Sequence, residues 1–550
     1  MGLREYPKTI ISLILVIVLF SSIHFFNHLN IQELEYTEAW GEAVKINKIS
    51  TSDKSLISNY KGNIITVNTS SPNIVNYSIL NSNGQSIKSG KSNLINFNNI
   101  KVDNIKLISN KLFYIYKNKL YVSEFQKEEG FSKSKNILSN IIDFTAHKSD
   151  KGITITSVSE DTIEVYLLGD SINRIFKVDN DLGVEKAYYR QVNGVDSLYC
   201  ISTENYDIQK VLVMSLNGKN KGNIFKIEEV NKYSGYNINE LNIDYIDNNV
   251  IITYVVNLNN QGYSSNNIKY NFFDIENFEN EKYSFENKKY DISRIGLDID
   301  TYIDSNKLHI VGSGKNIKNK YTDTSDIFEI IVNQKGEIEK SEFISTTQKY
   351  SKNVKLINKG NETYVIFDEI ISEGYITSLI SNNEQFLSNE TITKDDYIDA
   401  LYKSSTSPLI ALGYSFLRGF IILLFMLIPF WGIYLFIKNK RIESEKIKSA
   451  IVILAYIILN LLLFEFLYFK LVKQVQFYPD ILYTNIYRII APLIINIVSL
   501  IVVVIFYRES DKNNKEYTYV VFSTFFIILD VYLSNIVHSP FSFIGKLIKF

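Results

Sequence analysis

Cysteine is almost absent from this chain: its 550 residues include one, Cys200. It lies in the apolar run Leu198-Tyr199-Cys200-Ile201. A single cysteine excludes an intrachain disulfide and a multi-cysteine metal cluster. The apolar neighbours predict that Cys200 is a small buried side chain.

The chain also lacks an excess of charge of either sign. It has 58 lysines and arginines against 59 aspartates and glutamates, and its formal net charge is -1. The basic surface expected of a nucleic-acid-binding protein is therefore missing, so we predict no nucleic-acid partner. Proline is scarce as well, with 7 residues, while Asn, Ile, Lys and Tyr are abundant. This composition is typical of a bacterial protein from an AT-rich genome.

Catalytic, cofactor and metal motifs are lacking too. The stretch Gly312-Ser313-Gly314-Lys315 has neither the first glycine nor the final Ser or Thr of a phosphate-binding loop. Two groups of alternating aspartates look like calcium loops, but neither is followed by the glutamate that completes the pattern. These aspartates are Asp298, Asp300 and Asp304, and Asp179 and Asp181. We therefore predict no catalytic residue, no cofactor and no bound metal.

What the chain does have is a set of long apolar segments, one near the N-terminus and four in the last quarter. The first, Ile10 to Phe26, follows Arg4 and Lys8 and precedes a run of glutamates that begins at Glu33. This charge order is typical of an anchor with a cytoplasmic N-terminus. We predict an uncleaved anchor over 1–30 rather than a cleaved signal peptide, because no A-x-A-like cleavage site follows the apolar core.

The four later segments are each long enough to cross a hydrocarbon core of about 30 Å. They span approximately 408–437, 449–469, 487–507 and 518–538. The loop after the first of them is basic, with Lys438, Lys440, Arg441, Lys446 and Lys448. Because basic loops stay in the cytoplasm, we predict a multi-pass plasma-membrane protein with its large middle domain and its C-terminus outside. Its four-helix transmembrane domain covers 408–538, and 539–550 form a short outer interfacial tail.

Between about 45 and 400, short β-prone runs recur between Asn, Gly, Asp and Ser turns. The runs begin next to Gly62, Asn110, Lys151, Asp196, Asn248, Asn306 and Asn361. Successive marks are 41 to 58 residues apart, which is the size of a propeller blade. Tight turns such as Asn83-Gly84 and Asn217-Gly218 then link further strands. We predict a mainly β domain outside the cytoplasm, a seven-bladed β-propeller, with a two-domain β-sandwich assembly as the alternative.

Three ionisable side chains fall inside the predicted spans: Arg418, Glu465 and Asp530. Charges within a bilayer are costly, so such residues are functional candidates by default. At about 1.5 Å per residue, all three lie in the outer half of the bilayer. Opposite charges at similar depth predict an ion pair that fixes the helices or lines a polar cavity. In the alternative, Glu465 pairs with Lys470 at the headgroups, and Arg418 and Asp530 remain to be explained.

This layout favours a non-enzymatic membrane protein that displays its propeller at the bacterial cell surface to bind a protein, a glycan or another ligand. Its helices would contact the lipid bilayer and a membrane or surface partner. The alternative is an accessory or permease-like subunit of a transport or export complex. The layout resembles mechanotransmission-type ABC permeases, which normally have three later spans, and insertases with a β-rich outer domain, which need a long cytoplasmic hairpin. An enzyme is the third hypothesis, and the sequence does not identify the ligand.

Overall fold

The computed structural model of the chain contains two compact units. A β unit comprises Glu35–Lys318 and Thr324–Glu390, and a helical unit comprises Met1–Leu34 and Thr391–Phe550. The structure describes residues 6–33, 39–41, 43–49, 55–71, 74–94, 104–260, 263–274, 276–277, 279–285, 292–316, 324–345, 349–359, 361–371, 374–387, 394–465, 485–512 and 518–538.

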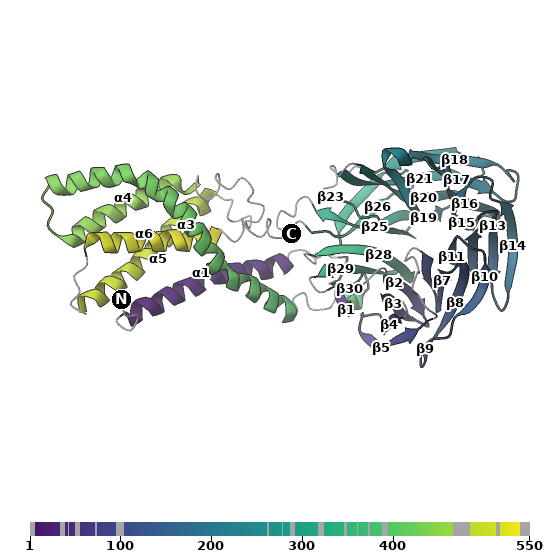
Figure 1. Cartoon of the computed structure of the whole chain (residues 1–550), viewed down its shortest axis with the longest axis horizontal. Coiled ribbons are helices and arrows are strands. Elements are labelled where there is room, and N and C mark those ends of the chain that lie inside the picture. Colours follow the sequence, from purple (N-terminus) through teal and green to yellow (C-terminus); the bar gives the residue numbers. More distant parts are fainter. Residues whose placement is uncertain are drawn as a thin grey trace. The chain divides into compact units, whose positions relative to one another are not determined.

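The β unit is a seven-bladed β-propeller, as predicted, and most of its strands are labelled in Figure 1. Each blade is an antiparallel sheet whose strands pair in chain order, apart from the short β9 (Gly130–Phe131) and β23 (Ile292–Ser293) and from the seventh blade. Blades one to three consist of β2 (Ser55–Tyr60), β3 (Asn63–Ser71), β4 (Ile74–Leu80) and β5 (Ser86–Asn93); β6 (Ile105–Ile108), β7 (Lys111–Tyr116), β8 (Lys119–Gln126) and β10 (Lys135–Ser139); and β11 (Asp143–Ser149), β12 (Gly152–Val158), β13 (Thr162–Leu168) and β14 (Ile172–Asp179).

Blades four to six consist of β15 (Val184–Val192), β16 (Val195–Glu204), β17 (Ile208–Ser215) and β18 (Ile224–Asn231); β19 (Tyr236–Ile246), β20 (Asn249–Asn260), β21 (Tyr263–Asp274) and β22 (Glu279–Ser284); and β24 (Ile299–Asp304), β25 (Lys307–Asn316), β26 (Asp326–Val332) and β27 (Ile338–Phe343). The seventh blade joins β28 (Tyr350–Lys359), β29 (Glu362–Ile371) and β30 (Gly374–Ser381) to β1 (Val44–Ile49), which comes from the other end of the unit.

The first strands of the blades form a ring. β2 contacts β6, β6 contacts β11, and the series continues through β15, β19, β24 and β28 back to β2. The ring is closed a second time by β1, which runs antiparallel to β30 with Val44 opposite Leu379 and Ile49 opposite Tyr375. The two ends of the β unit are thus tied together in one sheet.

The seven marks taken from the sequence lie at the start of the second strand of each blade: β3, β7, β12, β16, β20, β25 and β29. Several of these turns need left-handed backbone, with φ of 49° at Lys61 and 84° at Gly62, and 50° at Asn193 and 81° at Gly194. Two successive residues of positive φ are typical of the type I′ turn, whose twist matches that of antiparallel strands. Residues that tolerate positive φ, chiefly Asn and Gly, therefore explain the period seen in the sequence.

The core of the β unit lies between neighbouring blades, where both faces of each sheet are covered. In β29, Tyr364, Val365, Ile366 and Phe367 are each 0% exposed. Strands buried on both faces carry continuous apolar runs rather than alternation. Cys200 in β16 is 1% exposed within such a run, which confirms that it is a small buried side chain.

A polar network joins the first blade to the seventh. The carboxylate of Asp368 on β29 is 0% exposed. It accepts hydrogen bonds from the hydroxyl of Ser55 on β2, from the hydroxyl of Thr377 at 2.8 Å and from Nδ2 of Asn353 at 2.9 Å. Because the donors come from β2, β30 and β28, this one carboxylate holds the strands on both sides of the closure.

Two glycines in equivalent turns allow a matched test of packing. Gly218, between β17 and β18, and Gly336, between β26 and β27, have φ of 74° and 75°. A Cβ at Gly218 would meet nothing within 4 Å, whereas one at Gly336 would lie 2.2 Å from Cζ of Tyr283. We expect Gly218→Ala to cost about 1 kcal/mol through backbone strain alone. Gly336→Ala should cost about 1 to 3 kcal/mol more, because the ring of Tyr283 must move. Urea unfolding of both variants measures the difference, and equal losses would contradict the clash.

The helical unit contains α1 (Pro7–Glu33), α3 (Lys394–Asn439), α4 (Glu445–Glu465), α5 (Asn485–Lys512) and α6 (Tyr519–His538). One N-terminal helix and four helices after the propeller were predicted, and this order is confirmed; a further short helix, α2 (Glu384–Leu387), precedes α3. By length and composition, at least four helical segments can cross a membrane: Pro7–Phe26, Glu445–Leu463, Ile490–Asp511 and Tyr519–His538. The predicted span 408–437 lies within α3. The predicted tail 539–550 and residues 466–469 of the second span lie outside the described residues.

Several helix ends meet at one end of this unit. The carboxylate of Glu509 on α5 accepts hydrogen bonds from the backbone N–H groups of Lys8 and Thr9, both at 2.8 Å. Helix α1 has no acidic residue in its own first turn, so Glu509 supplies the negative charge that a helix N-terminus favours. In the same way Glu445 accepts from the backbone N–H of Tyr519 at 2.7 Å. Nζ of Lys446 on α4 lies 5.0 Å from the ring centroid of Tyr507 on α5, so the starts of α1, α4 and α6 and the end of α5 lie together.

Candidate functional site

The strongest candidate site in the propeller is the channel inside the ring of first strands. It encloses a cavity of about 270 Å³ lined by residues from all seven first strands. Six charged side chains line it: Lys106, Arg190, Glu240, Asp244, Asp300 and Lys355. They belong to β6, β15, β19, β24 and β28, so the charges of five blades converge on one space.

The channel charges are balanced and partly paired. Nζ of Lys106 lies 3.2 Å from Oε1 of Glu240, and Nζ of Lys355 lies 3.8 Å from Oε2 of the same residue. The side chains of Lys106, Glu240 and Lys355 are 25%, 25% and 20% exposed. They are therefore within reach of water and of a small solute, although each has a counter-charge.

The remaining channel carboxylates accept hydrogen bonds from the channel wall. Oδ2 of Asp300 accepts from the backbone N–H of Leu356 at 3.0 Å, and Oδ2 of Asp244 accepts from the hydroxyl of Thr301. Burial raises the pKa of Asp244 to about 6, against the opposing effects of Thr301 and Arg190. Burial likewise lowers the pKa of Arg190, and Asp244 partly compensates.

The acidic side chains of the channel stabilise the charged form of Lys355. Burial alone would lower the pKa of its ammonium, but Asp300, Glu240 and Asp298 raise it above the ordinary value. An opposite charge close to a buried group stabilises its ionised form. Lys355 is therefore a permanent cation that holds the acidic side chains of β19 and β24 in place.

Asp143, at the start of β11, gives a pH-dependent prediction for the channel wall. It is 6% exposed, and burial raises its pKa from 3.8 to about 6, although Lys186 and Lys106 oppose the shift. The folded state then binds this proton more tightly than the unfolded state, so stability falls as pH rises from about 4 to about 6. We expect Asp143→Asn to raise the free energy of unfolding by roughly 2 kcal/mol at neutral pH and by little at about pH 4. Urea unfolding at both values tests this, and a gain that is equal at both would contradict it.

A second polar cluster surrounds the buried carboxylate of Glu329 on β26. It accepts hydrogen bonds from the hydroxyl of Tyr302 at 2.6 Å, from Nδ1 of His309 at 2.8 Å and from Nε1 of Trp40 at 3.1 Å. The rings of Tyr302 and His309 stack with centroids 4.5 Å apart. A pocket of about 330 Å³ adjoins this cluster. Because Trp40 precedes β1, the cluster holds the segment that leads into the closing strand.

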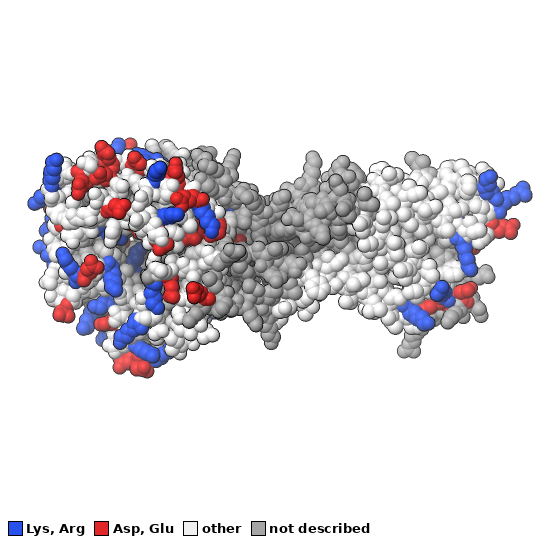
Figure 2. Space-filling view, turned by 180° about the vertical axis from the view of Figure 1, so that it is seen from behind, with Lys and Arg blue, Asp and Glu red and all other residues white. Residues whose placement is uncertain are grey.

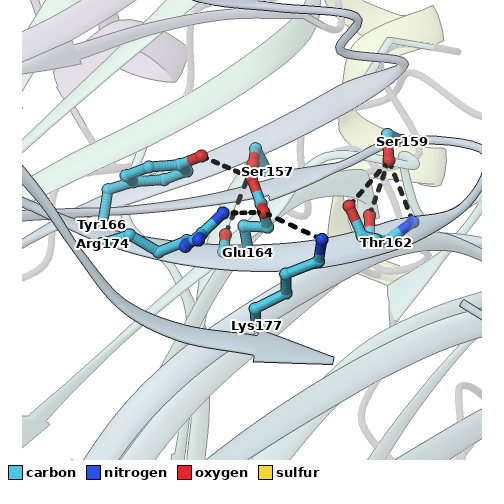
Figure 3. A network of polar contacts seen from close by, with 7 residues as sticks. All are labelled: Ser157, Ser159, Thr162, Glu164, Tyr166, Arg174 and Lys177. Atoms are coloured by element: carbon cyan, nitrogen blue, oxygen red, sulfur yellow. Dashed lines mark hydrogen bonds and ion pairs between the residues drawn. The ribbon is translucent and has the colours of Figure 1, made fainter. Parts of the chain in front are cut away.

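A third polar cluster lies on the outer strands of the third blade (Figure 3). Glu164 on β13 accepts hydrogen bonds from the hydroxyl of Tyr166 and from Arg174 on β14, and Lys177 lies 4.0 Å away. Nearby, the hydroxyl of Ser159 donates to the backbone oxygen of Thr162. The hydrogen-bonding groups of Glu164, Tyr166 and Arg174 are paired with one another across the β13–β14 hairpin. Exposed ion pairs of this kind add little stability. We therefore treat the cluster as part of the surface and not as a binding site.

Of the three ionisable candidates predicted within the membrane spans, Arg418 and Asp530 contact different side chains. Arg418 on α3 donates to Oδ1 of Asn535 on α6. Asp530 accepts from Tyr456 at 2.7 Å and from Asn460 at 2.9 Å, and the hydroxyl of Ser499 lies 3.4 Å from its other oxygen. Among the residues that the structure describes, no ion pair joins Arg418 to Asp530. Glu465 is the last residue of α4, and its side chain and Lys470 lie outside the described part.

Sequence reasoning missed both the channel and the cluster around Glu329. Asp300 was considered only as part of an incomplete calcium pattern, and His309 had no assigned role. Lys106, Arg190, Glu240 and Lys355 each look like an ordinary polar position in a β-prone segment. One available signal was their place in the strand before each marked turn, since a propeller brings those strands to its centre.

Comparisons with known proteins leave the chain without an assigned family. No family model matches it, and no curated protein does. Similar solved structures include the polysaccharide lyase Uly1, with a TM-score of 0.42 at 10% identity over 62% of this chain and 91% of the other. They also include BBS1N in complex with ARL6DN, with a TM-score of 0.40 at 9% identity over 62% and 96%. At these values the likeness carries no inference about ligand or activity.

Proposed function

We propose that this chain is a membrane-anchored binding protein whose propeller takes up a polar ligand, or a polar segment of a partner protein, in its central channel. The supporting observation is the convergence of three basic and three acidic side chains from five blades on one cavity. Rigid sheets hold these groups, so their spacing is fixed before a ligand arrives.

The channel also limits what can bind. Its volume of about 270 Å³ is near the lower end of ligand pockets, and its charges cancel. A small ligand that carries both donors and acceptors, such as a sugar residue or a zwitterionic group, suits it better than a large anion or an apolar molecule. A protein partner would insert one polar side chain or a chain end.

A comparison of two glutamine variants tests this use of the channel. Glu240→Gln removes the carboxylate shared by Lys106 and Lys355, whereas Glu128→Gln alters a side chain that is 85% exposed. Each full-length chain is purified from its native membrane in mild detergent, and bound proteins and small molecules are quantified by mass spectrometry. We expect a retained partner or ligand to be lost with Glu240→Gln and kept with Glu128→Gln. Equal retention by both variants would contradict a channel site.

We also propose that the propeller lies outside the cytoplasm. The helix ends that meet near Glu445 and Glu509 carry more basic than acidic residues. Charged side chains of the helical unit gather towards one end of it in Figure 2, while the walls of its described part are largely uncharged. The basic residues of the segments 6–9, 438–448 and 508–512 are Lys8, Lys438, Lys440, Arg441, Lys446, Lys448, Arg508 and Lys512. The positive-inside rule assigns such an end to the cytoplasm. Because α1 begins and α3 ends in these basic segments, the part of the chain between the two helices, which includes the propeller, is expected on the other side of the membrane.

A subunit of a transport or export complex is the second candidate function. The observation that favours it is the polar interior of the helical unit, where Arg418 is 4% and Asp530 0% exposed. A simple anchor does not need buried ionisable groups, which are costly in a bilayer. A stoichiometric nucleotide-hydrolysing subunit in the same purification would support this function over a binding protein that acts alone.

A further inference from the structure

The helical unit contains a buried acid whose surroundings are uncharged. Asp530 lies near the middle of α6 and is 0% exposed. Its hydrogen-bond partners come from two other helices: Tyr456 and Asn460 on α4, and Ser499 on α5. Among the described residues, no basic side chain pairs with it. An unpaired carboxylate in an apolar interior is strongly destabilising unless a proton or a metal cation neutralises it.

The two carboxyl oxygens of Asp530 have different hydrogen-bond partners. Oδ2 accepts from both the hydroxyl of Tyr456 at 2.7 Å and Nδ2 of Asn460 at 2.9 Å. Oδ1 has the hydroxyl of Ser499 at 3.4 Å, beyond the usual length of an O–H···O bond. A neutral carboxylic acid fits this asymmetry, because its carbonyl oxygen accepts two bonds while its O–H group is itself a donor that can point towards the hydroxyl oxygen of Ser499.

The neighbouring basic groups contact a different part of α6. Arg418 on α3 donates to Asn535, Nε2 of His24 on α1 lies 2.5 Å from the backbone oxygen of Ile536, and Nδ1 of His538 lies 2.7 Å from that of Ser534. Tyr456 is the one titratable partner of Asp530 among its hydrogen bonds. Glu509 on α5 lies ten residues beyond Ser499 and caps α1.

A second observation points to a ligand of positive charge at this place. The side chain of Asn460 is 3% exposed and donates to Asp530, yet its Oδ1 has no hydrogen-bond partner in the described structure. The same holds for Oδ1 of Asn496, one helical turn before Ser499 on α5. Oδ1 of Asn460 is thus an acceptor oxygen without a donor on a side chain that contacts Asp530, and such an oxygen favours a proton or a small hard cation.

We propose that Asp530, with Tyr456, Asn460 and Ser499, forms a proton-binding site inside the helical unit. The proton is held on Oδ1, and its release leaves a carboxylate that Tyr456 and Asn460 stabilise through Oδ2. A group of this kind is suited to a proton relay or to a helix arrangement that changes with protonation. The site does not depend on what the propeller binds.

Dicyclohexylcarbodiimide tests the proposal directly, because this apolar reagent reaches acids inside membranes and reacts with their protonated form. The acid proton moves to one carbodiimide nitrogen while the carboxyl oxygen bonds to the central carbon. The adduct rearranges to a stable acylurea with no leaving group. The full-length chain in its membrane is treated at about pH 6 and about pH 9, and modified peptides are located by mass spectrometry. We expect Asp530 to be labelled in the wild type and in Glu465→Gln, and to be labelled more at the lower pH. Asp530→Asn should carry no label at this position.

Salt and a second variant separate the alternatives. Sodium chloride should protect Asp530 from labelling no better than choline chloride does. Selective protection by sodium would show that the site binds a sodium ion and not a proton, and would overturn the proposal. Tyr456→Phe keeps the acid and removes a donor that favours its ionised form, so its labelling should equal or exceed that of the wild type. No label on Asp530 at either pH in the wild type would also overturn the proposal, and that result needs no variant to fold.

Discussion

Replacing Asp368 by alanine is expected to lower the free energy of unfolding of the propeller by about 3 to 5 kcal/mol. The carboxylate is 0% exposed and accepts from Ser55, Thr377 and Asn353. Its removal leaves these donors buried without an acceptor, and two of them hold β2 and β30 on either side of the ring closure. The loss should therefore affect the whole ring and not one blade.

Tryptophan fluorescence measures this loss with little interference. The chain has 2 tryptophans, and Trp40, which is 3% exposed, belongs to the β unit, whereas Trp431 lies on α3. In a Trp431→Phe background, urea unfolding followed at Trp40 reports on the propeller. The control Asp179→Ala, at the exposed end of β14, should change stability by less than about 0.5 kcal/mol. A loss below about 1 kcal/mol for Asp368→Ala would show that the network is not what closes the ring.

Replacing Glu329 by alanine is expected to cost about 3 to 4 kcal/mol at neutral pH. Three buried donors, on Trp40, Tyr302 and His309, would lose their acceptor. Burial alone would raise the pKa of Glu329, but the hydrogen bonds from His309 and Tyr302 hold it below its ordinary value of 4.5. A carboxyl with a lowered pKa stabilises the fold above its unfolded pKa and loses that effect as pH falls. The cost of the variant should therefore shrink below about pH 4.

Circular dichroism follows the unfolding of this variant, because Trp40 is itself a partner of Glu329. Glu279→Ala on the exposed strand β22 is the matched control. Protease should also cut the segment before β1 sooner in Glu329→Ala than in the control, since Trp40 is no longer held. Unchanged stability together with unchanged cleavage would contradict the role given to this cluster.

The blade period was predictable because turns have strict chemical needs. Gly62, Asn306 and several other marks lie at hairpins where positive φ restricts the choice of residue. Continuous apolar runs such as that in β29 follow from burial on both faces. Together these patterns predicted seven blades from local sequence alone.

Contacts made by ring closure were not predictable in the same way. Val44–Ile49 reads as one more β run, and nothing local shows that it pairs with Gly374–Ser381. Asp368 and Ser55 are far apart in the sequence, as are Lys106 and Glu240, and each looks like a surface residue by itself. Their proximity is a property of the closed ring, so it required the structure.

The intramembrane residues show a similar limit. Hydropathy singled out Arg418 and Asp530 and suggested that opposite charges at similar depth pair. The depth of a residue in the bilayer does not say which face of its helix it lies on. Asp530 and Asn535 are five residues apart on α6, and at about 100° per residue their side chains point about 140° apart. Asn535 therefore meets α3, where Arg418 lies, while Asp530 meets α4 and α5.

The accessibility of single cysteines from either side of the membrane tests most directly the proposal that membrane-crossing helices hold the propeller on the outer face. The one natural cysteine is buried, so Cys200→Ser gives a background without thiols. Tyr233→Cys places a thiol on the propeller at a position 89% exposed, and Lys440→Cys places one at the exposed turn between α3 and α4. We predict that a membrane-impermeant maleimide labels Tyr233→Cys in intact cells and Lys440→Cys only after permeabilisation. The opposite pattern, or labelling of both in intact cells, would contradict the account.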